Sequence, residues 1–248
     1  MNQFTEFNNF VYEPIAFSKG KAYNLPINLN TLNEIFGTRT PREAEMKMAN
    51  ERGKYRHIKD PINLEEQALV LMGDTIYNTL VKEYTEKQWG RECKDLPASI
   101  ITRLIIRFTY SNNYYNDSYQ GIPYNGYTNI FENMLKGIEV KLNHNITLKE
   151  LKEFDCPIIF TGPIDELYDY QFGKLDYLKV RYEEKIEKTD NYQGVAVINH
   201  IDKDIPYTRT IEHNFFNPKL VDKTIVSYEY FDKDADIIAY PIQDEKNT

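Results

Sequence analysis

The chain has 248 residues, of which 41% are hydrophobic and 27% are charged, and its formal net charge is −8 at pH 7. This length allows one large domain or two small ones, with ample residues for a hydrophobic core. The acidic balance argues against a general nucleic-acid-binding protein, because such binding depends on neutralising phosphates. Any phosphate binding must therefore come from a few locally placed arginines, and we expect no nucleic-acid partner.

The sequence contains no targeting signal that we can identify. Cys93 and Cys156 have no CxxC spacing and define no disulfide framework. The N-terminus lacks the basic and apolar regions of a signal peptide, and no stretch approaches the roughly 18 apolar residues of a membrane span. A reducing cytoplasm and the absence of a membrane partner are the resulting expectations.

The first half of the chain predicts helices. Residues 1–28 contain short extended pieces that we expect to be linking strands or loop. Four polar residues then stand where helix N-caps are expected, and they are Asn30, Thr40, Asn63 and Asp74. Gly37 should end the first helix, and Pro97 should begin a last short helix that runs through Arg103. Residues 29–105 are therefore predicted to form a small helical bundle.

The second half predicts a different pattern. Helices are expected at 128–135, 147–153 and 165–172, and strands at 138–142 and 157–160. Four further strands are expected to follow one another in antiparallel order at 177–184, 192–200, 206–213 and 223–230. The predicted fold class is α+β, in which the helical bundle (29–105) lies beside an antiparallel sheet formed by 106–127 with 173–240.

Residues 103–127 combine arginines with tyrosines. Arg103 and Arg107 lie in an otherwise uncharged run that leads into Tyr110, Tyr114, Tyr115, Tyr119 and Tyr124. A guanidinium among apolar residues needs an anionic partner, and aromatic rings beside fixed cations suit a ligand with a flat base and a phosphate. The alternative is a tyrosine-rich strand and turn with two surface arginines.

Two more residues have a functional and a structural interpretation. Trp89, the single Trp, ends a helix in YTEKQWG and is either a stacking surface for a base or ordinary core. Arg209 lies in an alternating strand, where a cross-strand ion pair with a glutamate is the alternative to ligand binding. The four histidines are scattered, so we predict no metal site.

Several long segments together resemble the UDP-galactopyranose mutases, a family of flavoenzymes. The similar runs are YTEKQWG (84–90), LPASIITRLIIRFTYSNNYYNDSYQGIP (96–123), GYTNIFENML (126–135), IIFTGPIDELYDYQFGKL (158–175), PYTRTIEH (206–213) and DEKN (244–247). The resemblance implies interconversion of UDP-galactopyranose and UDP-galactofuranose with reduced FAD. In that chemistry the flavin N5 attacks the anomeric carbon, expels UDP, and allows the sugar to open and reclose.

The resemblance also implies roles for individual residues. Tyr84 and Trp89 would line the uridine site, while Arg103 and Arg209 would be the catalytic diphosphate and sugar clamps. Tyr114 would donate a hydroxyl to a phosphate, with Asn113 beside it in the substrate site. The segments that approach FAD would contribute Gly126, Tyr127, Val140, Thr161 and Gly162, and residues 128–172 would be part of a Rossmann-like FAD-binding domain.

One part of the family pattern is absent from this sequence. The family begins with a strand–GxGxxG–helix unit that binds the FAD pyrophosphate, and no such unit occurs here. We therefore expect this chain alone to retain FAD weakly or not at all, and a homodimer or a companion segment to supply the missing FAD domain. The alternatives to a mutase that binds UDP and UDP-galactose are a non-catalytic UDP-sugar-binding remnant and a relative of the flavoprotein oxidases.

Overall fold

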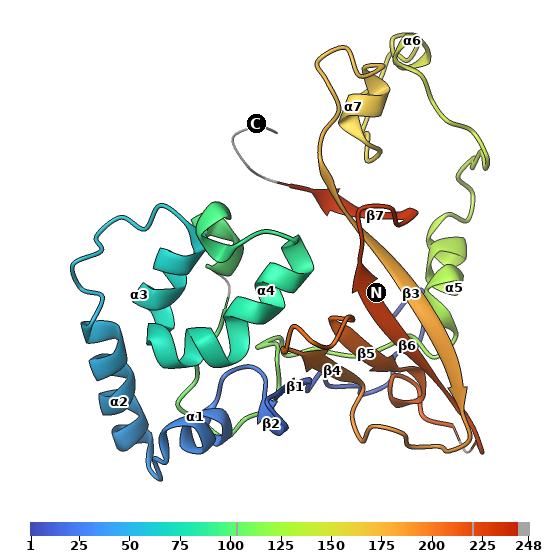
Figure 1. Ribbon diagram of the computed structural model, residues 1–248. Coiled ribbons are helices and arrows are strands. Elements are labelled where there is room, and N and C mark those ends of the chain that lie inside the picture. The colour runs from blue at the N-terminus through green and yellow to red at the C-terminus, as the bar shows by residue number, and fades with distance from the viewer. Residues whose placement is uncertain (103, 220, 243–248) are drawn as a thin grey trace.

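The computed structural model describes residues 1–102, 104–219 and 221–242. Figure 1 shows three parts: a cluster of helices formed by α1 to α4, a central sheet, and an arm that carries α5, α6 and α7. Helices and a mixed sheet occur side by side, so the predicted α+β class is confirmed.

The helical part follows the predicted caps closely. Its α-helices are α1 (Leu29–Phe36), α2 (Pro41–Gly53), α3 (Leu64–Ile76) and α4 (Lys82–Trp89), with a π-helical turn at Tyr77–Val81 and 3-10 turns at Cys93–Asp95 and Ala98–Ile101. Thr40 and Asn63 cap α2 and α3 as predicted, through side chains that accept from Glu43 N and Glu66 N. The cap of α1 is Asn28 rather than Asn30, because the Asn28 side chain accepts from the backbone N–H of Thr31.

The core of this part is built where α1, α2 and α3 meet. Its fully buried side chains include Leu32, Met48, Leu64, Met72 and Ile76, which the helical periodicity brings to the inner faces of the three helices. Tyr84 and Trp89 on α4 are half-buried and pack against the same cluster. The helices therefore form a rigid support for the two aromatic residues that the sequence assigns to a ligand.

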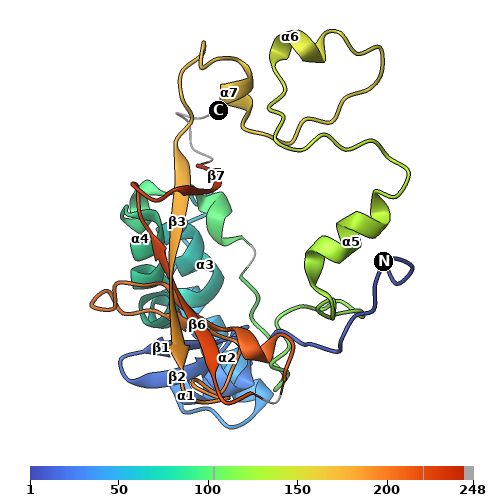
Figure 2. The same ribbon diagram turned by 90° about the vertical axis from the view of Figure 1, so that its right-hand side faces the viewer.

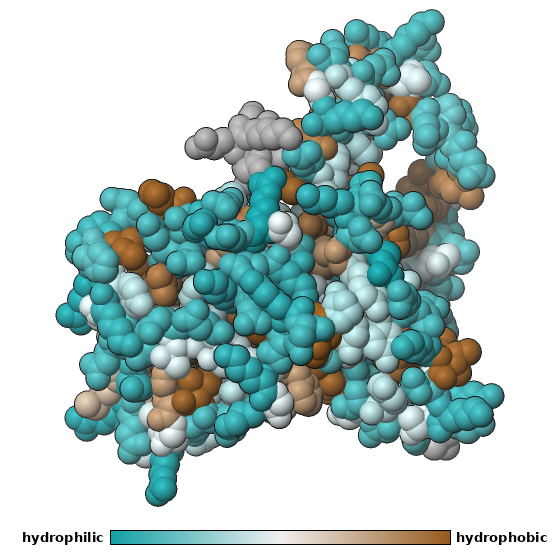
Figure 3. Space-filling view, viewed as in Figure 1, coloured by the Kyte–Doolittle hydropathy of each residue, from teal (hydrophilic) through white to brown (hydrophobic). Residues whose placement is uncertain are grey.

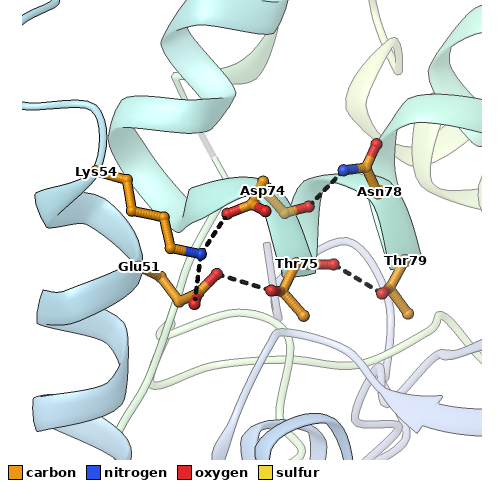
Figure 4. Close-up of polar contacts among 6 residues, drawn as sticks. All are labelled: Glu51, Lys54, Asp74, Thr75, Asn78 and Thr79. Atoms are coloured by element: carbon orange, nitrogen blue, oxygen red, sulfur yellow. Dashed lines mark hydrogen bonds and ion pairs between the residues drawn. The ribbon is translucent and has the colours of Figure 1, made fainter.

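Gly73 kinks α3, and a polar cluster around the buried Glu51 secures the kink. Gly73 has φ +77°, and a Cβ at this position would lie 2.5 Å from Cβ of Glu51. Lys54 Nζ lies 3.0 Å from Glu51 and 2.9 Å from Asp74, and Thr75 donates to Glu51 at 2.7 Å (Figure 4). The side chain of Asp74 is thus engaged by Lys54, where the sequence predicted a helix cap.

The sheet has seven strands in the order β2-β1-β4-β5-β6-β3-β7. They are β1 (Ile15–Ser18), β2 (Lys21–Asn24), β3 (Tyr177–Glu187), β4 (Val197–His200), β5 (Arg209–Glu212), β6 (Thr224–Phe231) and β7 (Ile237–Pro241). Every pair is antiparallel except β1 and β4, which run parallel. The sheet is therefore mixed, β7 is a strand that the sequence analysis did not predict, and β1 and β2 belong to the sheet rather than only linking it.

Residues 106–127 do not enter the sheet, so this part of the prediction is wrong. Among the described residues of this stretch, Ile106 and Pro123 form only isolated bridges, to Ile27 and Phe7. The backbone groups instead make scattered bonds, such as Arg107 N to Ile27 O and Tyr114 N to Tyr12 O. These partners replace the regular ladder that a strand requires.

The arm also departs from the prediction. It contains α5 (Gly126–Met134), α6 (Leu148–Leu151) and α7 (Ile164–Leu167), whereas 138–142 and 157–160 are not strands. A strand needs a neighbour for its backbone hydrogen bonds, and these stretches have none within the described chain. Figure 2 shows the arm extending away from the sheet, and Figure 3 shows apolar side chains reaching its surface. Among the described residues no helix is long and apolar enough to cross a membrane.

Candidate functional site

Arg209 is the cation around which the described candidate residues gather. It begins β5 and pairs with Glu229 of β6, which lies directly opposite in the strand register. Arg209 Nε and Nη2 each donate to the Glu229 carboxylate at 2.7 Å. The cross-strand ion pair considered as an alternative is therefore present, and a third of the Arg209 side chain remains exposed.

Tyrosines surround this arginine. Tyr84 of α4 and Tyr12 from the segment before β1 both lie within the electrostatic reach of Arg209, as does Tyr240 of β7. Burial raises the pKa of Tyr12 to about 12, outweighing the opposite effect of the Arg209 charge. Burial alone would lower the pKa of Arg209, but its hydrogen bonds to Glu229 raise it, so the guanidinium stays charged. The result is a fixed positive charge framed by hydroxyl donors.

Lys87 connects α4 to the loop that leads into β5. Its ammonium donates to the carbonyl oxygens of His200, Asp202, Ile205 and Tyr207 at 2.7, 3.1, 3.0 and 3.0 Å. The hydroxyl of Tyr84, three residues earlier on the helix, donates to Asn199 Oδ1 of β4 at 3.3 Å. These contacts set the position of α4, and hence of its aromatic side chains, relative to Arg209.

The loop that carries Tyr114 is stabilised from within. The guanidinium of Arg107 donates to the carbonyl oxygens of Asn113 and Tyr114, which makes Arg107 a structural residue rather than an exposed cation. The Tyr114 ring packs edge-on against Tyr12, with ring centroids 5.5 Å apart. Asn113 Oδ1 is buried and finds no hydrogen-bond donor among the described residues. A buried acceptor of this kind needs a partner that the described protein atoms do not supply.

Trp89 lies beside a separate cavity of about 620 Å³. The cavity is lined by the C-terminal end of α4, the start of β3 and residues near α7, including Lys174, Leu178 and Phe231. One face of Trp89 packs against the helical core while its ring also meets Tyr240, with centroids 6.0 Å apart. The core interpretation of Trp89 is therefore confirmed, its stacking on a base stays a prediction, and Tyr240 connects Trp89 with the Arg209 group.

The structure brings together some of the predicted substrate residues and leaves others apart. Tyr84, Tyr114 and Arg209 form one group, Asn113 adjoins it through the loop, and Trp89 lies at its edge. Arg103 and the DEKN run at 244–247 lie outside the described residues. No group of three His, Cys, Asp or Glu that could hold a metal occurs in the described ranges.

The residues expected to approach FAD do not converge. Gly126 and Tyr127 begin α5, Val140 follows on the extended part of the arm, and Thr161 and Gly162 precede α7. All five are exposed, and none of them lines the cavity beside Trp89. These five positions therefore do not line one common cavity among those described.

Three residues of the site were missed by sequence reasoning. Glu229, Tyr12 and Tyr240 carry no motif, and each belongs to the site because of the pairing of strands or the course of an extended segment. The expected cross-strand ion pair with a glutamate was the only signal for this partner, and the register of β5 against β6 decides that it is Glu229. No comparable signal marks Tyr240, which lies on the strand that was not predicted.

Comparisons with known proteins identify relatives along nearly the whole chain. The family model described as UDP-galactopyranose mutase matches residues 79–248. The dTDP-fucopyranose mutase of Escherichia coli is 38% identical over 254 residues, which cover 98% of this chain and 67% of that protein. The probable UDP-galactopyranose mutase of Klebsiella pneumoniae is 37% identical over 249 residues, covering 98% of this chain and 64% of that protein.

The fold is also found among solved structures. A crystal structure of reduced UDP-galactopyranose mutase is similar with a TM-score of 0.63 at 13% identity, over 93% of this chain and 59% of that chain. At this identity the likeness concerns the fold alone. The chain spans about two thirds of the length of the curated relatives that it matches.

Proposed function

Because the chain belongs to the UDP-galactopyranose mutase family, we propose that it provides the nucleotide-sugar site of a mutase that interconverts UDP-galactopyranose and UDP-galactofuranose. The observation that carries this proposal is the oriented guanidinium of Arg209 with Tyr84 and Tyr114 beside it. A fixed, solvent-reachable cation framed by hydroxyls suits a diphosphate, and each charge-assisted bond contributes about 1.5–3 kcal/mol.

The proposed roles follow from the chemistry of each side chain. Arg209 and Arg103 bind the diphosphate and sugar, and the Tyr114 hydroxyl donates to a phosphate oxygen. The Trp89 ring stacks on the base, which contributes roughly 1–3 kcal/mol, while Tyr84 lines the same site. The buried Asn113 Oδ1 accepts from a hydroxyl of the ligand.

The flavin of the family requires a further element. The five residues assigned to FAD lie apart and exposed, so we propose that a companion polypeptide with a GxGxxG unit completes the cofactor site against the arm. The apolar side chains of the arm support this proposal, because Phe131, Leu142 and Ile159 are 58%, 80% and 90% exposed. A second copy of this chain is the weaker candidate, since its sequence contains no GxGxxG.

A dTDP-linked sugar is the second candidate substrate. It is favoured by the 38% identity to a protein named dTDP-fucopyranose mutase. The two candidates differ in the base, in the ribose 2′-hydroxyl and in the sugar C6 hydroxyl, so titration of UDP and dTDP against Trp89 fluorescence tells which nucleotide the site prefers. Tighter binding of UDP is expected, and tighter binding of dTDP would move the proposal to the second substrate.

The proposed mutase activity is tested by adding FAD to the purified protein. Purified protein should show no flavin absorbance between about 350 and 500 nm, and addition of FAD should leave none bound after gel filtration. Product analysis with UDP-galactose and excess reduced FAD, with and without a separately expressed GxGxxG segment from a relative, tests for the mutase. Turnover that appears only with the segment supports the proposal. UDP binding without turnover in either mixture would leave a non-catalytic UDP-sugar-binding protein.

A further inference from the structure

Glu229 is buried beneath the arginine of the site and is bonded on both of its oxygens. Oε1 accepts from Arg209 Nε at 2.7 Å and from Thr208 Oγ1 at 2.9 Å. Oε2 accepts from Arg209 Nη2 at 2.7 Å and from the Tyr182 hydroxyl at 3.1 Å. The Glu229 side chain is 1% exposed, so these four donors replace all of its hydration.

Such a carboxylate has little freedom to move. Its backbone is fixed in β6 between β5 and β3, and its side chain is fixed by donors from both neighbouring strands, Thr208 before β5 and Tyr182 on β3. A buried charge with this many partners holds its geometry strongly, because loss of any partner leaves a polar group unsatisfied. Glu229 is therefore a rigid support for the guanidinium.

The bidentate pair with Glu229 fixes the orientation of the Arg209 guanidinium. Glu229 engages Nε and Nη2, which fixes the plane of the guanidinium and leaves Nη1 outside the pair. Tyr12, Tyr84 and Tyr240 lie within electrostatic reach of the same guanidinium, and a third of the Arg209 side chain remains exposed. The pair with Glu229 thus holds the guanidinium in one plane beside these hydroxyls.

We infer that Glu229, held by Thr208 and Tyr182, is a positioning residue that orients Arg209 for the diphosphate of the ligand. This inference rests on the proposed function, because it assumes that a nucleoside diphosphate binds beside Arg209. It implies that Glu229 contributes through geometry even though its negative charge opposes an anionic ligand. Removal of the side chain should then weaken diphosphate binding, although a purely electrostatic argument predicts the opposite.

The test compares two ligands that differ only in the diphosphate. The dissociation constants of UDP and uridine are measured by Trp89 fluorescence for the unchanged chain and for Glu229→Ala, Glu229→Gln and Tyr182→Phe. We expect Glu229→Ala to weaken UDP at least tenfold and uridine less than twofold. Glu229→Gln keeps the shape and one acceptor oxygen, so it should restore UDP affinity to within about threefold.

Two further variants keep the test decisive if Glu229→Ala does not fold. Tyr182→Phe removes one of the four donors to the carboxylate and should weaken UDP about threefold while leaving uridine unchanged. Glu183→Gln is the matched control, because Glu183 also accepts from an arginine and a tyrosine, Arg181 and Tyr230, but is exposed. It should change neither constant.

The outcomes separate this inference from the proposed function. If UDP binds the unchanged chain and Glu229→Ala or Tyr182→Phe leaves its affinity unaltered, the positioning role is wrong and the proposed function stands. Equal loss of UDP and uridine would assign Glu229 a general structural role and also overturn the inference. If the unchanged chain binds neither ligand, both the proposed site and the inference fall.

Discussion

Replacement of Lys87 by methionine should destabilise the protein and loosen the site. Methionine keeps the apolar part of the side chain and removes the ammonium that donates to four carbonyl oxygens at 2.7–3.1 Å. Burial lowers the pKa of Lys87 to about 8, so the group is largely charged at pH 7, where the experiment is done.

The magnitude follows from the hydrogen bonds. Three N–H groups serve four acceptors, and a bond from a charged donor contributes about 1.5–3 kcal/mol. Methionine recovers the cost of burying the charge, and water reaches some of the freed carbonyls. We therefore expect a net loss of about 2–4 kcal/mol in the free energy of unfolding, measured by urea denaturation.

The matched control is Lys203→Met. Lys203 also joins the loop to α4, through Glu86, but its side chain is 56% exposed. An exposed ion pair contributes at most about 1 kcal/mol. If Lys87→Met costs no more than Lys203→Met, then the four carbonyl contacts do not secure α4 against the sheet, and this account of how Tyr84 is positioned is wrong.

Two further predictions concern the kink of α3 and the acid stability of the sheet. Gly73→Ala should cost roughly 2–4 kcal/mol by urea denaturation, because it combines a positive φ with a Cβ placed 2.5 Å from Glu51. Gly37→Ala is the control, because Gly37 also has a positive φ (+68°) but open space around it, so the substitution should cost only the backbone strain of about 1 kcal/mol. Equal costs for the two substitutions would show that the contact with Glu51 does not matter. Burial and the Lys87 charge lower the pKa of His200 from 6.5 to about 4, so between these values the unfolded chain binds the additional proton and stability falls as the pH falls. His200→Gln should make this fall in the free energy of unfolding shallower by up to about 1.4 kcal/mol per pH unit. An unchanged slope would refute the lowered pKa of His200.

Local sequence signals predicted helix starts correctly where the capping side chain bonds within its own helix. Thr40 and Asn63 cap their helices because each side chain satisfies a backbone N–H three residues later. Asn30 failed as a cap because Asn28, two residues earlier, takes that role. The choice between two asparagines depends on how the chain enters from β2, which local sequence does not specify.

The strand predictions were wrong where a segment becomes a strand only if a neighbouring strand is available to pair with it. Residues 138–142 have the alternation of a strand, yet they lie exposed because no neighbouring strand is available to them in the described chain. Residues 106–127 are rich in tyrosine, but their backbone bonds go to the segments around Tyr12 and Ile27 instead of a ladder. The β-propensity of a segment does not show which other segment its backbone will bond to.

In the candidate site, too, local sequence signals predicted some residues and long-range pairing decided others. Tyr84, Trp89, Tyr114 and Arg209 were identified through motifs, and the ion pair of Arg209 was anticipated as an alternative from the alternating strand. The identity of its partner, Glu229, required the register of β5 against β6. The residues proposed to touch a ligand could thus be predicted from sequence motifs, whereas the groups that support Arg209 depend on long-range pairing.

The central claim is that Arg209 belongs to a site for a nucleoside diphosphate, and calorimetric titration of UDP tests it most directly. The account predicts that the unchanged chain binds UDP and that Arg209→Ala weakens binding by about 10- to 150-fold, which corresponds to the loss of about 1.5–3 kcal/mol. Uridine affinity should change little. Absence of UDP binding by the unchanged chain, or equal UDP affinity of the two proteins, would contradict the account.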